Sequence, residues 1–97
     1  MGFGESGGIV DVYDKEDLPT KQRPGRANAR YNLIVPSGRG PRGRKQSRWT
    51  NADGIPKLDM DYNHPGENID FPHYHDWQDG ERSTEHFDYE WAAAKYK

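Results

Sequence analysis

Strict alternation of apolar and polar residues marks two neighbouring segments in the second half of the chain. In "IPKLDMDYN" (residues 55–63), Leu58, Met60 and Tyr62 share one side of an extended chain, with charged side chains between them. The segment "IDFPHYHDW" (residues 69–77) alternates with the same period. A period of two residues is that of a β-strand, whose successive side chains point to opposite faces of a sheet. The pattern therefore predicts two strands, and the turn-forming "HPGEN" between them predicts that they are neighbours.

The second of these segments places two histidines on one face. His73 and His75 are two residues apart, so on a strand both rings project to the same side, with Cα atoms about 7 Å apart. Phe71 and Trp77 follow the same alternation. Pro72 cannot donate a ladder hydrogen bond, so the strand either lies at a sheet edge or begins at this residue. We therefore expect a stripe of aromatic and histidine rings along one face of this strand.

Weaker patterns complete the predicted domain. Apolar alternation predicts short strands over residues 8–14, 30–36 and 83–91, and clusters of Gly, Pro, Asn and Asp predict turns over 51–54 and 78–82. Helix formers in "EWAAAKYK" predict a short C-terminal helix over residues 90–97. The Gly-, Pro- and Arg-rich residues 37–48 predict a basic loop. The expected fold class is α+β: a small antiparallel sheet of three to five strands in a single domain over residues 1–97, with residues 1–28 irregular or flexible.

Composition limits the core of this domain. The 97 residues are 31% hydrophobic, and the mean hydropathy is -1.26. A chain of this size and polarity builds one thin core, and the aromatic residues, 12% of the chain, would supply most of its buried area. The absence of cysteine excludes disulfides and thiolate chemistry. No apolar run approaches the roughly 20 residues that span a bilayer, so we expect no membrane partner.

Charge is segregated along the chain. One lysine and five acids give residues 1–20 a net charge of -4, nine Lys and Arg with no acid give residues 21–50 a charge of +9, and four Lys and Arg with eleven acids give residues 51–97 a charge of -7. Such asymmetry indicates an anionic partner, most often nucleic acid. The alternative is that the basic and acidic segments pair within the chain.

The basic segment also carries aromatic residues. Arginine grips phosphate with two hydrogen bonds, and a loop of this composition exposes backbone N–H groups to the same ligand. Trp49 and Tyr31 flank the cations and could stack on bases. The candidate phosphate-binding cations are Arg39, Arg42, Arg44, Lys45 and Arg48.

The histidines allow a metal site. His73, His75 and either His64 or Asp61 could supply three ligands and leave one position open, as catalytic zinc sites require. An H-x-H spacing on a strand is short and weakly specific for this role, and the chain has no HExxH motif.

Imidazoles can also act without a metal. A histidine near its ordinary pKa of about 6.5 can take a proton from a ribose 2′-hydroxyl, and a second, protonated one can give a proton to the leaving 5′-oxygen. Arg48 or another cation then stabilises the charge on the phosphate. His73 and His75 are the candidate acid and base, with His64 as a third candidate. The alternative is that both rings only pack and hydrogen-bond to carboxylates, a structural role also expected of His86.

Three motifs within residues 51–83 follow one another in a recognisable order. They are Asp53-Gly54-Ile55-Pro56 with Leu58-Asp59-Met60-Asp61-Tyr62, then His64-Pro65-Gly66, then Pro72-His73-Tyr74-His75-Asp76-Trp77. In this respect the chain resembles the C-terminal toxin domains of bacterial polymorphic toxin systems, many of which are similar to metal-independent ribonucleases of the barnase/EndoU/colicin/RelE-like group. The resemblance implies RNA, with tRNA among the candidates, as target, a cognate immunity protein, and an effector secreted or delivered into the cytoplasm of a target cell.

These patterns lead to one hypothesis, a ribonuclease toxin domain that uses no cofactor. Its catalytic candidates are His73, His75, His64 and Arg48. Its substrate-binding candidates are Arg39, Arg42, Arg44, Lys45, Trp49, Tyr62 and Trp77. Two alternatives stay open: a metal-dependent nuclease in which His73, His75 and Asp61 hold a divalent metal such as zinc, and a non-enzymatic module that binds nucleic acid or a protein partner.

Overall fold

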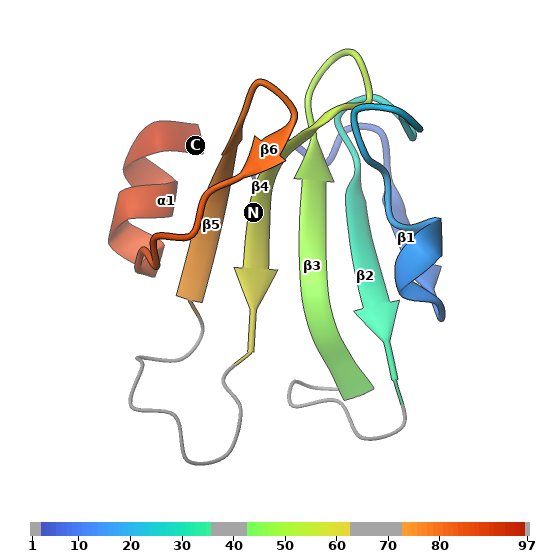
Figure 1. Cartoon of the computed structure of the whole chain (residues 1–97), viewed down its shortest axis with the longest axis horizontal. Coiled ribbons are helices and arrows are strands. Elements are labelled where there is room, and N and C mark those ends of the chain that lie inside the picture. Colours follow the sequence, from blue (N-terminus) through green and yellow to red (C-terminus); the bar gives the residue numbers. More distant parts are fainter. Residues whose placement is uncertain (1–2, 36–42, 63–72, 97) are drawn as a thin grey trace.

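The computed structural model describes residues 3–35, 43–62 and 73–96 and shows an open six-stranded sheet with one C-terminal helix (Figure 1). The strands follow one another across the sheet in chain order, β1 to β6; β1 is parallel to β2, and the other neighbours are antiparallel. The elements are β1 (Ile9–Val12), the 3₁₀ turn η1 (Lys15–Asp17), β2 (Arg30–Ile34), β3 (Arg44–Thr50), β4 (Pro56–Asp61), β5 (His73–Gln78), β6 (Glu81–Arg82) and α1 (Tyr89–Tyr96).

The predicted α+β class is confirmed. The sheet has one strand more than the three to five expected, because the two-residue β6 joins its edge. It is also mixed rather than purely antiparallel, since β1 pairs with β2 in the parallel sense. The predicted C-terminal helix forms as α1. The described part of β5 begins at His73, and residues 69–72 of the predicted strand, with Pro72, lie outside the described residues.

Two hydrophobic clusters lie on opposite faces of the sheet and are offset from each other. The larger contains Leu58, Met60 and Tyr62, which the alternation had placed on one side of β4, together with Phe3, Trp49, Tyr74 and Ala92. The smaller packs Leu18 against Ala29, Tyr31 and Leu33 near β1 and β2. Because each cluster covers part of one face, the other face of β4 and β5 carries no hydrophobic cluster among the described residues.

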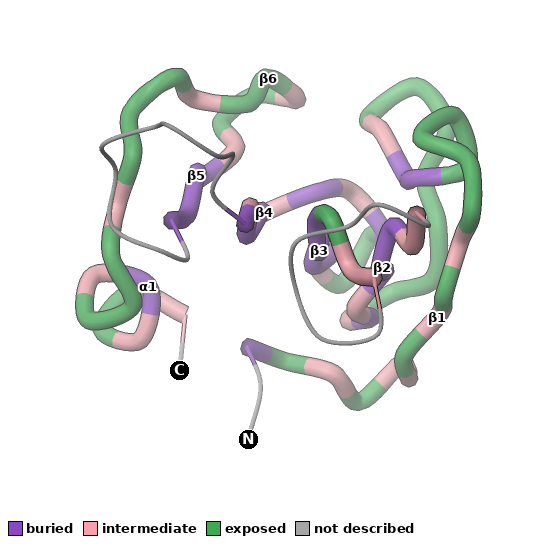
Figure 2. The backbone as a smooth tube through the Cα atoms, turned by 90° about the horizontal axis from the view of Figure 1, so that it is seen from below, coloured by how far each residue is buried: buried purple, intermediate pink, exposed green. Residues whose placement is uncertain are grey.

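The view along the strands shows the same layering. Figure 2 places α1 and the N-terminal segment on one side of β4 and β5, and β6 with the loop that follows β1 on the other. Phe3 packs on the α1 side, where its ring meets Trp49 and Tyr74 edge-on at centroid distances of 5.1 and 5.8 Å. On the β6 side, β4 contributes Asp59 and Asp61 and β5 contributes His73 and His75, and these polar side chains form the site described below.

Two expectations about local structure are wrong. The basic loop expected over residues 37–48 is replaced in its second part by β3, which begins at Arg44; residues 36–42 lie outside the described part of the chain. This stretch has no apolar alternation, and it becomes a strand because both of its edges pair, with β2 and with β4. The strand expected over residues 83–91 is reduced to a single bridge from Phe87 to Tyr74, and the helix begins at Tyr89.

The turn between β5 and β6 explains why β6 folds back. Asp79 and Gly80 have φ values of 53° and 80°, so both central residues of the turn are in the left-handed region. Two such residues match the twist of a two-residue hairpin, for which Asp-Gly is a preferred sequence. The hairpin carries the chain over the polar face of β5.

We expect Asp76→Asn to destabilise the protein by roughly 1–3 kcal/mol at neutral pH. The buried Asp76 carboxylate accepts hydrogen bonds from Gln78 Nε2 and from Lys95 Nζ of α1, both at 3.1 Å, and so ties the helix to β5. Burial alone raises the pKa of Asp76, but the hydrogen bonds from Gln78 and Lys95 outweigh it, and the pKa lies below its ordinary value. The stabilisation is therefore complete above the unfolded pKa of about 3.9 and is lost as pH falls through the folded value.

Urea unfolding of wild type and Asp76→Asn at several pH values measures this difference. It should be largest near neutral pH and should shrink below about pH 4. Asp79→Asn is the matched control, because Asp79 is exposed and its left-handed backbone suits Asn equally well. A difference that stays constant down to acid pH would contradict the assignment.

Candidate functional site

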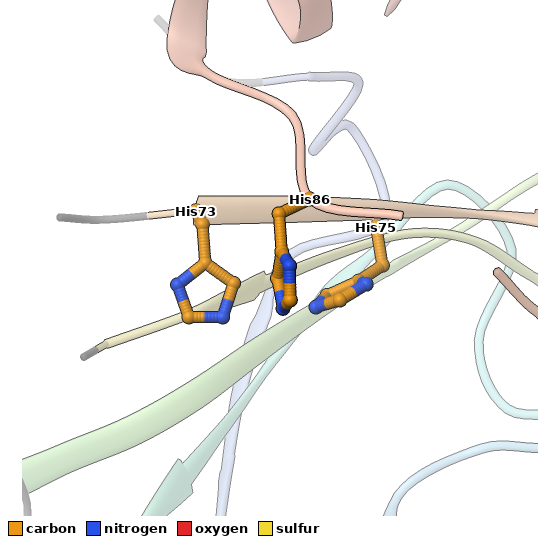
Figure 3. Close-up of side chains that lie close together, drawn as sticks. All are labelled: His73, His75 and His86. Carbon is orange, nitrogen blue, oxygen red and sulfur yellow. The ribbon is translucent and has the colours of Figure 1, made fainter. Parts of the chain in front are cut away.

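Three histidine rings meet on the polar face of β5 (Figure 3). His73 and His75 come from β5, and His86 comes from the segment between β6 and α1. Their ring centroids are 5.3 Å apart for His73 and His75, 4.6 Å for His73 and His86, and 4.8 Å for His75 and His86. One nitrogen from each ring lies within 4.8 Å of the other two. The prediction that His73 and His75 share a face is confirmed, and we call the three residues the histidine cluster.

An irregularity in the strand that returns from the hairpin brings His86 into this cluster. Trp77 pairs with Arg82, whereas Tyr74 bridges to Phe87. Between these two pairs, β5 advances by three residues and the returning segment by five. The returning segment therefore contains a bulge of two extra residues. This register places His86 across from His75, so that both rings lie on the same face.

Two carboxylates from β4 lie beside the cluster. The register pairs Asp61 with His73 and Asp59 with His75, as expected for neighbouring strands. Asp61 Oδ2 is 3.7 Å from His73 Nε2 and 3.5 Å from His75 Nε2. Arg82 reaches both carboxylates, with its Nε 2.9 Å from Asp59 Oδ2 and its terminal NH₂ bonded to Asp61. The cluster thus borders a network of alternating carboxylates and guanidinium groups.

Arg48 belongs to this network as a structural member. Its Nε and NH₂ groups donate to the two oxygens of the fully buried Asp59 at 2.8 and 3.0 Å, and its third nitrogen donates to the Pro19 carbonyl at 3.0 Å. The Trp77 ring lies 4.6 Å from the guanidinium carbon. Because Arg48 is 6% exposed and its donors are engaged, it is poorly placed for the catalytic role expected of it, the stabilisation of charge on the phosphate. Arg82, with 34% of its side chain exposed, is the cation that faces the cluster from the surface.

The hydrogen bond of the His75 ring indicates which of its two nitrogens carries the proton. Its Nδ1 lies 3.0 Å from the Ser83 carbonyl oxygen. A carbonyl can only accept, so Nδ1 carries the proton and the lone pair of the neutral ring is on Nε2. Burial lowers the pKa of His75, and the charge of Arg82 lowers it further, while Asp61 acts in the opposite direction. His75 therefore presents an unprotonated Nε2 at neutral pH.

Most of the predicted substrate-binding residues lie elsewhere. Trp49 and Tyr62 are buried in the larger hydrophobic cluster, so their rings cannot stack on a base. Arg44 lines a pocket of about 590 Å³ together with Arg30, and Arg30 pairs with Trp49 on the face opposite the histidines. Lys45 is exposed, and Trp77 is partly buried beneath Arg48. Arg39, Arg42 and His64 lie outside the described residues.

Two of the functional residues at the site are not predicted from the sequence. Arg82 is absent from the candidates above, and His86 is expected there to be structural. The Asp-Gly signal at 79–80 could have found both, because a two-residue hairpin there folds the following residues back along the β5 histidines.

Comparison with protein-family models, with curated proteins and with solved structures finds no match for this chain. Within residues 3–35, 43–62 and 73–96, no helix has the length and apolar character needed to cross a membrane. The interpretation of the site therefore depends on its own geometry.

Proposed function

We propose that this protein is a ribonuclease toxin domain that cleaves RNA at the histidine cluster. The observation that carries the proposal is the convergence of three imidazoles and Arg82 beside two carboxylates on the side of β5 away from the larger core. His86 and Arg82 are exposed, so a substrate can approach from the β6 side. An imidazole can transfer protons and a cation can stabilise the charge that develops on a phosphate, so the cluster offers groups that can catalyse phosphodiester cleavage.

RNA supplies its own nucleophile for this reaction. The 2′-oxygen attacks the adjacent phosphorus, the bond between phosphorus and the 5′-oxygen breaks, and the products are a 2′,3′-cyclic phosphate and a free 5′-hydroxyl. The proton of the 2′-hydroxyl is accepted at the cluster, and one proton is delivered to the leaving 5′-oxygen. We assign the stabilisation of the negative charge on the phosphate to Arg82 rather than to Arg48, because Arg82 lies beside the cluster and 34% of its side chain is exposed.

The order of motifs in residues 53–77 supports the biological setting of the proposal. Its resemblance to polymorphic toxin domains suggests an effector that is secreted or delivered into the cytoplasm of a target cell, acts there on RNA such as tRNA, and is blocked by a cognate immunity protein. A protein inhibitor would be expected to cover the β6 side, where the exposed members of the site lie.

Incubation of the purified chain with a defined RNA and with its DNA counterpart tests the proposal. We expect the RNA to be cut to fragments ending in a 2′,3′-cyclic phosphate and the DNA to remain intact, because DNA lacks the 2′-hydroxyl. A single 2′-deoxy substitution at the cleaved nucleotide should abolish that cut. Expression in a host that lacks an inhibitor should arrest growth, and simultaneous replacement of His73, His75 and His86 by alanine should relieve the arrest.

Other results would identify another function. Equal cleavage of RNA and DNA would mean that water, rather than the 2′-oxygen, attacks the phosphate. Retention of intact RNA in a salt-sensitive complex would favour the non-enzymatic binding module and would refute the proposed ribonuclease.

A further inference from the structure

We infer that His73, His75 and His86 together bind one Zn²⁺ ion, with a fourth coordination position open toward solvent. The inference rests on the proposed function only for the part that the ion plays in RNA cleavage. The metal site itself depends on the histidine cluster alone. It differs from the site expected from the sequence, because the third ligand is His86 rather than Asp61 or His64.

The donor atoms of the histidine cluster suit zinc. Three imidazole nitrogens, one from each ring, lie within 4.8 Å of one another. Imidazole suits zinc and its transition-metal neighbours, whereas magnesium and calcium prefer oxygen ligands. Three protein ligands that leave one position for water is the arrangement of catalytic zinc sites.

A hydrogen bond holds His75 in the orientation that a metal ligand needs. A metal-binding histidine usually donates its other ring N–H to a carbonyl or carboxylate, which fixes the tautomer and the ring orientation. His75 Nδ1 donates to the Ser83 carbonyl at 3.0 Å and leaves Nε2 for an ion. The partner carbonyl lies in the hairpin segment that also delivers His86, so one local structure positions two of the three ligands.

The two carboxylates beside the cluster are held by arginines. Asp61 Oδ2 lies 3.5 Å from His75 Nε2, but it is also bonded to Arg82. Asp59 is buried against Arg48 and Arg82 and cannot turn toward the rings. With both acids held by arginines, the imidazoles are the remaining ligands in this part of the described chain, and Asp61 is placed to accept a hydrogen bond from a zinc-bound water.

Closing the site needs only a small movement. Zinc with nitrogen ligands at about 2.0–2.1 Å places tetrahedral nitrogens about 3.3 Å apart. The nitrogens of the cluster must therefore approach by at most about 1.5 Å from their separation of up to 4.8 Å. His73 and His75 are buried and fixed on β5, whereas His86 is exposed and can rotate toward them. The two fixed rings define the site, and the third ring closes it.

A zinc-bound hydroxide would then supply the proton transfers of the cleavage. It accepts the proton of the 2′-hydroxyl and becomes zinc-bound water as the 2′-oxygen bonds to phosphorus. That water returns a proton to the 5′-oxygen as the bond to phosphorus breaks, which regenerates the hydroxide. Zinc lowers the pKa of bound water to about 7, so the hydroxide is available at neutral pH.

Calorimetric titration of the chelator-stripped 97-residue chain with Zn²⁺ tests the site. We expect one ion per chain, no binding of Mg²⁺, and an affinity at least about 100-fold weaker in His86→Ala. Glu85→Gln, an exposed neighbour outside the cluster, should bind as wild type does. His86→Cys should restore binding through a thiolate, and with Co²⁺ in place of Zn²⁺ it should add a sulfur-to-cobalt charge-transfer band that wild type lacks.

The outcomes separate the metal site from the ribonuclease. Absence of Zn²⁺ binding, or binding that survives His86→Ala and His75→Ala unchanged, would overturn the metal site. Zinc bound through the three histidines without RNA cleavage would refute the ribonuclease and leave the metal site standing. Full cleavage by the stripped protein in the presence of chelator would support the metal-independent mechanism expected from the sequence and remove zinc from the reaction.

Discussion

Asp59→Ala is expected to lower the free energy of unfolding by about 3–5 kcal/mol, the range found when one partner of a buried ion pair is removed. Asp59 is completely buried and accepts hydrogen bonds from both Arg48 and Gln46. Its loss would leave the Arg48 guanidinium, which is 6% exposed, without its carboxylate and out of reach of water. For a small domain whose total stability is on the order of 5–15 kcal/mol, this is a large part of the whole.

The free energy of unfolding from urea or guanidinium titrations measures this loss. Asp53→Ala is the matched control, because Asp53 lies exposed in a turn and should cost less than about 0.5 kcal/mol. The double variant Arg48→Met/Asp59→Leu should be more stable than Asp59→Ala, since it removes the orphaned charge together with its partner. A loss below about 1 kcal/mol for Asp59→Ala would mean that water hydrates the Arg48 guanidinium or that another acid pairs with it.

The same buried pair explains why β3 was not recognised in the sequence. The side chains of β4 alternate between apolar and charged. This pattern, read from one segment alone, predicts that the segment is a strand and which of its side chains face the larger hydrophobic cluster. β3 has polar residues on both sides, and Arg48 is buried only because Asp59 on the neighbouring strand neutralises it. Burial of this kind depends on a partner strand, so a pattern within one segment cannot indicate it.

The candidate site likewise has one part that the sequence predicts and another that it does not. His73 and His75 could be placed together because their spacing on a strand fixes their relation to each other. His86 depends on a hairpin followed by a bulge, and a shift of register by one residue would have sent its ring to the other face. Arg82 became a site residue through the same hairpin. The sequence thus predicts the two histidines that lie on one strand. Placing His86 and Arg82, which the hairpin returns to that strand, requires the three-dimensional structure.

His75→Asn is expected to reduce the rate of RNA cleavage by about 10²–10⁴-fold while leaving the fold intact. The amide nitrogen of asparagine takes nearly the position of His75 Nδ1, so it can still donate to the Ser83 carbonyl, which lies 3.0 Å from that atom. The variant has no counterpart of Nε2, the nitrogen whose lone pair the hydrogen bond to Ser83 leaves available. The substitution therefore distinguishes the two roles of His75, because the structural hydrogen bond uses Nδ1 and the proposed chemistry uses Nε2.

Initial cleavage rates and thermal unfolding, measured on the same preparations, test this separation. The midpoint of unfolding should change little in His75→Asn. In His75→Gln the amide reaches toward the Nε2 position instead and leaves the Ser83 carbonyl unpaired, which costs roughly 1–3 kcal/mol. Glu85→Gln should match wild type in both measurements, since this exposed side chain lies outside the cluster. Cleavage at the wild-type rate by His75→Asn would show that His75 acts only through Nδ1, as a structural hydrogen-bond donor, and would remove it from both the ribonuclease and the zinc site.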